Sequence, residues 1–308
     1  MNNAARPQNI TLGIALIIAA ALTISVQDVV FKMFRGDLTL WQIFALRGLM
    51  ALPVLMIIGA LRGAFKQTVL ASITVWSLLR GFCLTMTFLA FYAAIPFLSL
   101  STVGAANYIA PIFVALLSAY VIGEAVGRLG WIGVCLGFIG VVVLLRPGSD
   151  AFSVFALLPI GGAAFYAVGH IITRTKCQSV PVAALTLSLN IMMMLAGLII
   201  SAILLLLQPT GPTVDAYPFL FGAWTAVGMN EWLLLIALVG FTVSIGMMLA
   251  AAYKMAPPAT IATFEYSYLV FVAVWDILFF DLTPTPFSLA GMAMIVLAGI
   301  LVMRGRKA

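Results

Sequence analysis

The chain has 308 residues, of which 64% are hydrophobic and only 8% are charged, with a formal net charge of +6 at pH 7. Soluble domains carry about 25% charged residues, so this composition, with a mean hydropathy of +1.21, excludes a soluble domain. Lipid offers no hydrogen-bond partners to a backbone, and runs of about twenty apolar residues without period-two alternation therefore predict membrane-spanning helices rather than barrel strands.

Ten apolar segments follow one another along the chain, and each is long enough to cross the hydrocarbon core of a bilayer, about 30 Å thick. They cover residues 12–31, 40–61, 72–94, 100–122, 129–146, 152–173, 182–207, 231–253, 259–280 and 286–303. The sequence thus predicts an all-α membrane protein with ten transmembrane helices. Five helices per half is an odd number, so a second copy of a five-helix unit must start from the opposite side of the membrane. We expect two inverted repeats, residues 1–148 and 149–308.

Lys and Arg residues between the segments set the expected orientation, because short loops rich in these residues stay cytoplasmic. With both termini inside, ten of them are cytoplasmic and three external. The cytoplasmic set is Arg6, Arg62, Lys66, Arg128, Arg174, Lys176, Lys254, Arg304, Arg306 and Lys307, and the external set is Lys32, Arg35 and Arg146. The net positive charge is then explained by topology and by contact with anionic membrane lipid, with no need for a nucleic-acid partner.

Ionisable residues inside the apolar segments point to a site, because each costs roughly 2.5–3.5 kcal/mol at a helix centre. Five of them are expected to serve coupling or charge pairing: Asp28, Lys32, Arg47, Arg80 and Asp276. Asp28 and Lys32 at i,i+4 are equally explained by a local ion pair, and the arginines by bracing of neighbouring carbonyls. Glu265 lies among aromatic residues, and Asp276, eleven residues later, returns to nearly the same face of one helix. A structural alternative for Glu265 is a hydrogen bond to a tyrosine hydroxyl or to a backbone group exposed by Pro257 and Pro258.

Aromatic and small polar residues form a second set, and together with Glu265 they suggest a cavity suited to a zwitterionic or amphipathic solute. The predicted cavity residues are Gln27, Thr85, Phe88, Asn107, Tyr108, Tyr166, His170, Glu265, Tyr266 and Tyr268. Pro111 and Pro159 are expected to kink their helices and free backbone carbonyls near this cavity. For any one aromatic residue, ordinary packing is the alternative.

The fourth segment, Pro111 to Leu117 running on to Gly123 and Glu124, resembles the repeat signature of EamA-type members of the drug/metabolite transporter superfamily. So do Lys32, Arg47, and the glycine-rich stretch from Gly130 to Gly140 that ends at Arg146 and Pro147. The second half departs from the pattern, with Tyr268 in place of Pro111 and Asp281 in place of Glu124. The resemblance implies ten helices with both termini inside, six of them around a central cavity. The run from Phe264 to Tyr268 is similar to that of the aromatic amino acid exporters.

This sequence lacks the residues that several other classes of protein require. With one histidine and no His-Glu-x-x-His pattern, neither an intramembrane enzyme nor a metal site is expected. No lysine is followed by Ser or Thr, so a phosphate-binding loop for ATP is absent from the sequence. No cofactor is expected. A channel stays open as an alternative, as does a structural membrane protein.

We therefore expect a multi-pass secondary transporter of the cell inner membrane that exports amino acids or related small metabolites by alternating access. A multidrug or cationic-metabolite exporter is the alternative, because Glu265 and Asp276 would serve as counter-charges. A monomer is expected, since the stripe that contains Gly133 and Gly137 is explained by packing within the bundle. A dimer through that stripe is the other interpretation.

Overall fold

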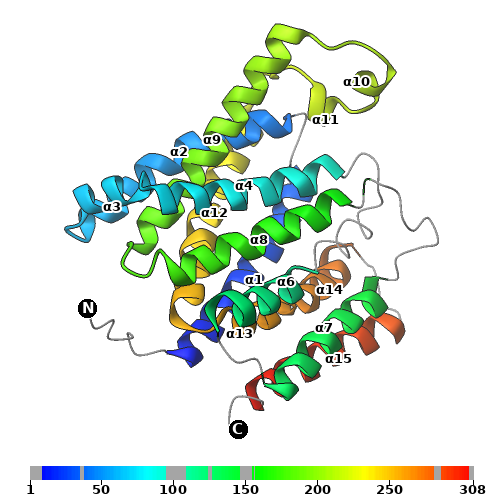
Figure 1. The fold of residues 1–308 in the computed structure, drawn as a ribbon. Coiled ribbons are helices and arrows are strands. Elements are labelled where there is room, and N and C mark those ends of the chain that lie inside the picture. Colours follow the sequence, from blue (N-terminus) through cyan, green and yellow to red (C-terminus); the bar gives the residue numbers. More distant parts are fainter. Residues whose placement is uncertain are drawn as a thin grey trace. The chain divides into compact units, whose positions relative to one another are not determined.

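The computed structural model describes residues 9–34, 38–94, 109–123, 127–145, 155, 157–280 and 286–304, and every regular element within them is helical. The helices of the first half are α1 (Ile10–Phe34), α2 (Leu40–Leu61), α3 (Phe65–Ser72), α4 (Val75–Ala94), α6 (Ala110–Leu117), the π-helical turn η1 (Ser118–Ile122) and α7 (Arg128–Leu145). Those of the second half are α8 (Leu157–Thr175), α9 (Val182–Leu207), α10 (Pro212–Ala216), α11 (Pro218–Phe221), α12 (Met229–Met255), α13 (Pro258–Glu265), α14 (Ser267–Phe280) and α15 (Pro286–Arg304) (Figure 1).

Among the described residues, five helices are long and apolar enough to cross a membrane. They span Ile10–Phe31, Leu40–Leu61, Val75–Ala94, Val182–Leu207 and Met229–Met255, and three shorter apolar helices span Ala110–Ile122, Arg128–Gly140 and Leu289–Leu301. The all-helical, membrane-spanning class predicted from the composition is thus confirmed. The inverted repeat and the orientation stay predictions.

Local sequence explains where several helices begin and end. The Asn9 side chain accepts a hydrogen bond from the backbone N–H of Leu12 at 3.0 Å, and the Thr39 hydroxyl accepts one from Gln42 at 3.4 Å, so each caps the start of a helix. Gln208 ends α9 in the left-handed conformation, with φ of 41°. Pro257 and Pro258 separate α12 from α13, because proline fits the first helical turn but not the interior of a helix.

The ninth predicted segment differs from expectation. Residues 259–280 read as one apolar run, but the structure interrupts the helix at Tyr266, between α13 and α14. The Ser267 hydroxyl donates to the Phe264 carbonyl at 2.7 Å, and the Leu269 N–H bonds the Tyr266 carbonyl at 3.1 Å in place of a regular helical partner. Glu265 therefore ends α13 while Asp276 belongs to α14. The side chain of Asp276 lies outside the described residues, so the shared face stays a prediction.

The chain divides into two compact units, each built from parts of both halves of the sequence. Unit 1 comprises Met1–Ser25, Met86–Gln178 and Met248–Ala308, and unit 2 comprises Val26–Thr85 and Ser179–Met247. The predicted boundary between repeats, at residues 148 and 149, lies outside the described residues.

In unit 1, α7 packs along α15, and α6 packs against α8 and α13 (Figure 1). Glycines allow the close approach of α7: a Cβ at Gly140 would lie 2.9 Å from the Gly291 carbonyl oxygen, and one at Gly137 would lie 2.6 Å from the Tyr266 ring. The glycine stripe of α7 is thus used, at these two positions, for packing inside unit 1.

In unit 2, α2 packs along α9 at very short range. A Cβ at Gly197 would lie 2.6 Å from both the Ala45 nitrogen and the Trp41 carbonyl oxygen. The first turn of α2 also holds a distant segment: the Trp41 indole donates to the Leu220 carbonyl at 2.7 Å. The Gln42 amide donates to the Thr225 carbonyl at 2.8 Å and accepts from the Thr225 N–H at 3.1 Å. The Gln42 side chain therefore hydrogen-bonds both the N–H and the carbonyl of Thr225, as a neighbouring β-strand would do for a non-helical segment.

Candidate functional site

Glu265, at the last residue of α13, forms the centre of a polar cluster within unit 1. Its Oε1 accepts a hydrogen bond from the Tyr166 hydroxyl at 2.6 Å and another from the Tyr253 hydroxyl at 2.8 Å. Tyr166 belongs to α8 and Tyr253 to the last turns of α12, so three helices converge on one carboxylate oxygen. Hydrogen bonds to an ionised acceptor are about twice as strong as neutral ones, and low-dielectric surroundings strengthen them further.

His170, one helical turn after Tyr166 in α8, completes the cluster. Its ring stacks on that of Tyr253, with centroids 3.7 Å apart and planes at 25°, and its centroid lies 4.3 Å from that of Tyr166. His170 and Tyr253 are both fully buried. The imidazole therefore fixes the ring of one hydroxyl donor and touches that of the other.

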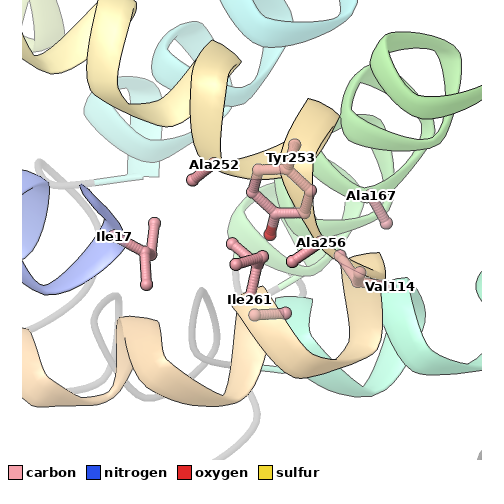
Figure 2. Close-up of a cluster of buried hydrophobic side chains, with 8 residues drawn as sticks. Ile17, Val114, Ala167, Ala252, Tyr253, Ala256 and Ile261 are labelled. Carbon is pink, nitrogen blue, oxygen red and sulfur yellow. The ribbon is translucent and has the colours of Figure 1, made fainter. Parts of the chain in front are cut away.

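Tyr253 is surrounded by apolar side chains. Figure 2 shows its ring beside Ala252, with the hydroxyl oxygen directed towards Ala256 and Ile261. Three further apolar side chains of this hydrophobic cluster come from α1, α6 and α8, namely Ile17, Val114 and Ala167. A hydroxyl buried in such a setting costs free energy unless it is hydrogen-bonded, and Glu265 supplies the acceptor.

The sequence predicted three members of this cluster, Tyr166, His170 and Glu265, and missed Tyr253. A tyrosine near the end of an apolar segment is typical of the membrane interface, which is why it did not stand out. The available signal was the tight turn at Pro257 and Pro258, since it folds α13 back beside the last turns of α12.

The other residues of unit 1 that were predicted to line a cavity have different surroundings. Tyr266 is fully buried and packs with Leu269 and Ile295, while Tyr268 lies half-buried against them. Phe88 is 39% exposed on α4. Asn107 and Tyr108 lie outside the described residues, and so does the side chain of Asp276.

Pro111 and Pro159 lie in the first turns of α6 and α8. Proline costs no helical hydrogen bond there, because the first N–H groups of a helix have no partner within it. The kinks predicted at these two residues are therefore not evident in the described parts of α6 and α8.

Unit 2 holds the two arginines that the sequence predicted as coupling or pairing residues. Arg80 is 1% exposed, and its Nη1 donates to the Leu185 carbonyl of α9 at 3.0 Å. Arg47 directs Nη2 at the Met193 sulfur, 3.5 Å away, and its guanidinium carbon lies 5.7 Å from the centroid of the Phe44 ring. Both guanidinium groups therefore contact α9, and whether they brace it or serve coupling stays a prediction.

Four further predicted residues of unit 2 lie in α1 or α4. Gln27 and Asp28 are half-buried in α1, and the side chain of Lys32 lies outside the described part. Thr85 is 2% exposed, and within the described residues its hydroxyl has no hydrogen-bond partner.

An apolar groove of about 320 Å³ runs beside the helix interruption in unit 1. Thr263 and Ser267 are its polar lining residues. The Thr263 hydroxyl donates to the Ala259 carbonyl within α13, and the Ser267 hydroxyl donates to the Phe264 carbonyl across the interruption. The groove therefore offers apolar surface and suits hydrocarbon rather than a polar solute.

Metal ligation finds no basis in the described part of the chain, where no three His, Cys, Asp or Glu side chains gather. Cys83, Cys135 and Cys177 are not joined by disulfides, and the first and last of them are buried. The arrangement at Glu265 offers hydrogen-bond acceptance and charge complementarity instead.

Comparison with known proteins finds similarity to membrane transporters. Residues 11–146 match the EamA-like transporter family. A riboflavin transporter of Rhizobium johnstonii is 27% identical over 63% of this chain and 58% of its own. The pseudopaline exporter CntI of Pseudomonas aeruginosa is 24% identical over 96% of this chain and 97% of its own.

A crystal structure of a protein 18% identical in sequence matches with a TM-score of 0.75 over 97% of both chains, which shows the likeness of fold alone. The family match over residues 11–146 and the relatives named as transporters together support a multi-pass membrane transporter that is similar to the EamA-like transporter family.

Proposed function

We propose that the chain exports amino acids or related small metabolites across the cell inner membrane by alternating access. The observation that carries this proposal is the cluster of Glu265, Tyr166, Tyr253 and His170. A carboxylate surrounded by phenol and imidazole rings can accept hydrogen bonds from a solute and pack against its apolar part, as sites for small molecules commonly do. An ionisable residue inside a membrane segment costs free energy, and this cost favours a functional role for Glu265.

The architecture of the proposal is ten crossings in two inverted repeats, residues 1–148 and 149–308, with both termini inside. The charge distribution between segments supports the orientation. The helix interruption next to Glu265 supports the placement of a site, because transporter sites form where helices are discontinuous. The remaining cavity residues inferred from the sequence stay predictions.

Transport by purified protein in liposomes tests the mechanism. Alternating access predicts saturable movement of labelled amino acids without nucleotide, accelerated by unlabelled substrate on the opposite side. The assay is run with and without a pH gradient, against a panel of amino acids. A strict requirement for ATP, or a rate that never saturates with substrate, would contradict the proposal and favour a pump subunit or a channel.

Cysteine labelling tests the orientation independently. Gln67 and Thr210 are exposed, and five predicted segments separate them. In a background without Cys83, Cys135 and Cys177, we expect Gln67→Cys to react only from the cytoplasmic side and Thr210→Cys only from outside. Labelling from the same side would refute the count of crossings, and the reverse pattern would refute the orientation.

A second candidate function is export of cationic metabolites or drugs, which the negative charge of Glu265 favours. Of the relatives named above, one is called a riboflavin transporter and the other a pseudopaline exporter, so proteins similar to this chain carry different solutes. Competition separates the two candidates: quaternary ammonium cations, which carry the positive charge but have no N–H donor and no carboxylate, should inhibit amino acid transport weakly if amino acids are the substrates, and strongly if cations are.

A further inference from the structure

The two oxygens of the Glu265 carboxylate have different surroundings. Oε1 accepts both phenol hydrogen bonds, from Tyr166 at 2.6 Å and Tyr253 at 2.8 Å. No hydrogen bond from any described residue reaches Oε2, and the side chain is only half-buried. One oxygen is therefore committed to the protein, while the other retains its capacity to accept a hydrogen bond.

We propose that Oε2 of Glu265 binds the protonated amine of the transported molecule, so that a primary or secondary ammonium group is the feature by which substrates are recognised. This inference rests on the proposed transport function and specifies the substrate group that the site takes. An ionised carboxylate accepts hydrogen bonds and donates none, and an ammonium group donates several. A charged hydrogen bond between the two is strongest in a site that excludes water.

Tyr166 and Tyr253 act as positioning residues for this contact. Rotation about the last side-chain bond of Glu265 would exchange its two oxygens, and the two phenols oppose it because they hold Oε1 from separate helices, α8 and α12. Tyr253 is itself held in place, since its ring stacks on His170 and is fully buried. The free oxygen thus has a defined direction before any ligand arrives, which lowers the cost of ordering the site on binding.

The charge of the cluster selects against other ligands. A solute whose only charged group is a carboxylate would be repelled by Glu265. A metal ion would need more ligands, and no group of three potential metal-binding side chains occurs in the described residues. An amine is the ligand whose charge and donors match one carboxylate oxygen next to aromatic rings.

Ligand-induced thermal stabilisation of the full chain in nanodiscs tests the proposal without requiring transport. The probes are phenethylamine, phenylalaninamide and butylamine as amines, with 3-phenylpropionate as the aromatic anion. A ligand that binds the folded state raises its melting temperature, and a tighter ligand at the same concentration raises it further. We expect the wild type to be stabilised by the amines, most strongly by the aromatic ones, and not by 3-phenylpropionate.

Variants assign the effect to Glu265. Glu265→Gln should weaken phenethylamine binding at least tenfold, Tyr253→Phe should weaken it about fivefold through loss of one hydrogen bond, and Glu265→Asp should retain part of it. Glu231→Gln is the matched control, because Glu231 lies in the first turn of α12, away from the cluster. Gel filtration verifies that each variant is folded. If Glu265→Gln does not fold, Tyr253→Phe tests the proposal in its place.

The proposal is overturned if none of the three amines stabilises the wild type, if 3-phenylpropionate stabilises it equally well, or if the folded Glu265 and Tyr253 variants bind phenethylamine as the wild type does. Failure here is distinct from failure of the proposed function: a chain that binds amines but moves no solute in liposomes refutes transport, whereas one that transports amino acids without regard to Glu265 refutes this inference.

Discussion

In unit 1 a carboxylate meets two phenol hydroxyls and leaves one oxygen unused, whereas in unit 2 two arginines contact the backbone and side chains of α9. Both units bury charge, but the anion is half-buried and the Arg80 guanidinium is 1% exposed. The difference teaches that a buried charge in a membrane protein is not by itself a ligand site. What distinguishes Glu265 is that hydroxyl donors from two helices, α8 and α12, converge on one of its oxygens, while its other oxygen accepts no hydrogen bond from the described residues.

Truncation of Arg80 gives the largest expected loss of stability and tests the supporting role of unit 2. Arg80→Ala removes one of the largest fully buried side chains and its bond to Leu185, so we expect a loss of about 3–5 kcal/mol, as for other large-to-Ala truncations in cores. Unfolding in SDS titrations measures it. Arg80→Met, which keeps most of the volume, should cost less, and Arg62→Ala at an exposed position should cost almost nothing. A stable Arg80→Ala variant that has lost transport would reverse the assignment of roles between the two units.

A methyl group added at Gly197 should give an intermediate loss in the same unit. Its Cβ would lie 2.6 Å from backbone atoms of α2, which cannot move aside as a flexible side chain would, so we expect Gly197→Ala to cost about 1–3 kcal/mol. Gly240→Ala is the control, since no described atom lies within 4 Å of its added Cβ. That substitution should be neutral, or stabilising by about 0.5–1 kcal/mol through helix propensity. Equal effects at the two glycines would show that the contact of α2 with α9 is not tight.

The smallest expected effect concerns two threonines in α4, and its sign is what matters. Thr85→Val removes a buried hydroxyl that has no partner among the described residues, and we expect a gain of up to about 1 kcal/mol. Thr87→Val should instead lose about 0.5–1.5 kcal/mol, because the Thr87 hydroxyl donates to the Gly162 carbonyl at 3.0 Å. The same SDS titrations compare the two. If Thr85→Val becomes more stable but transports poorly, the hydroxyl contacts substrate; if it loses stability, the hydroxyl has a structural partner.

The length of the apolar runs predicted where the helices lie, because a long apolar segment in lipid must satisfy its backbone hydrogen bonds internally and therefore forms a helix. The interruption at Tyr266 could not be predicted in the same way, since the run from Pro258 to Phe280 contains no internal glycine or proline. The break depends on the Ser267 hydroxyl taking the Phe264 carbonyl.

The candidate site was predicted in part. Glu265 and His170 were identified because an ionisable side chain inside an apolar segment costs free energy and therefore requires an explanation. Tyr253 escaped because its importance comes from a stack on His170 and a bond to Glu265, both of which exist only in the folded chain. Arg47 and Arg80 satisfied the same cost criterion as Glu265, and the sequence could not separate a brace from a binding group.

The anchoring of α2 through Trp41 and Gln42 has a consequence for biosynthesis. Their partners, Leu220 and Thr225, are 179 and 183 residues further along the chain. At about 5–20 residues per second, a ribosome needs roughly 9–37 s to make that stretch. Throughout that interval the indole and amide of the first turn of α2 lack these acceptors and need water or another protein in their place. The contact closes late in synthesis, so premature truncation before residue 225 should leave an N-terminal fragment that insertion and quality-control machinery recognises as unfinished.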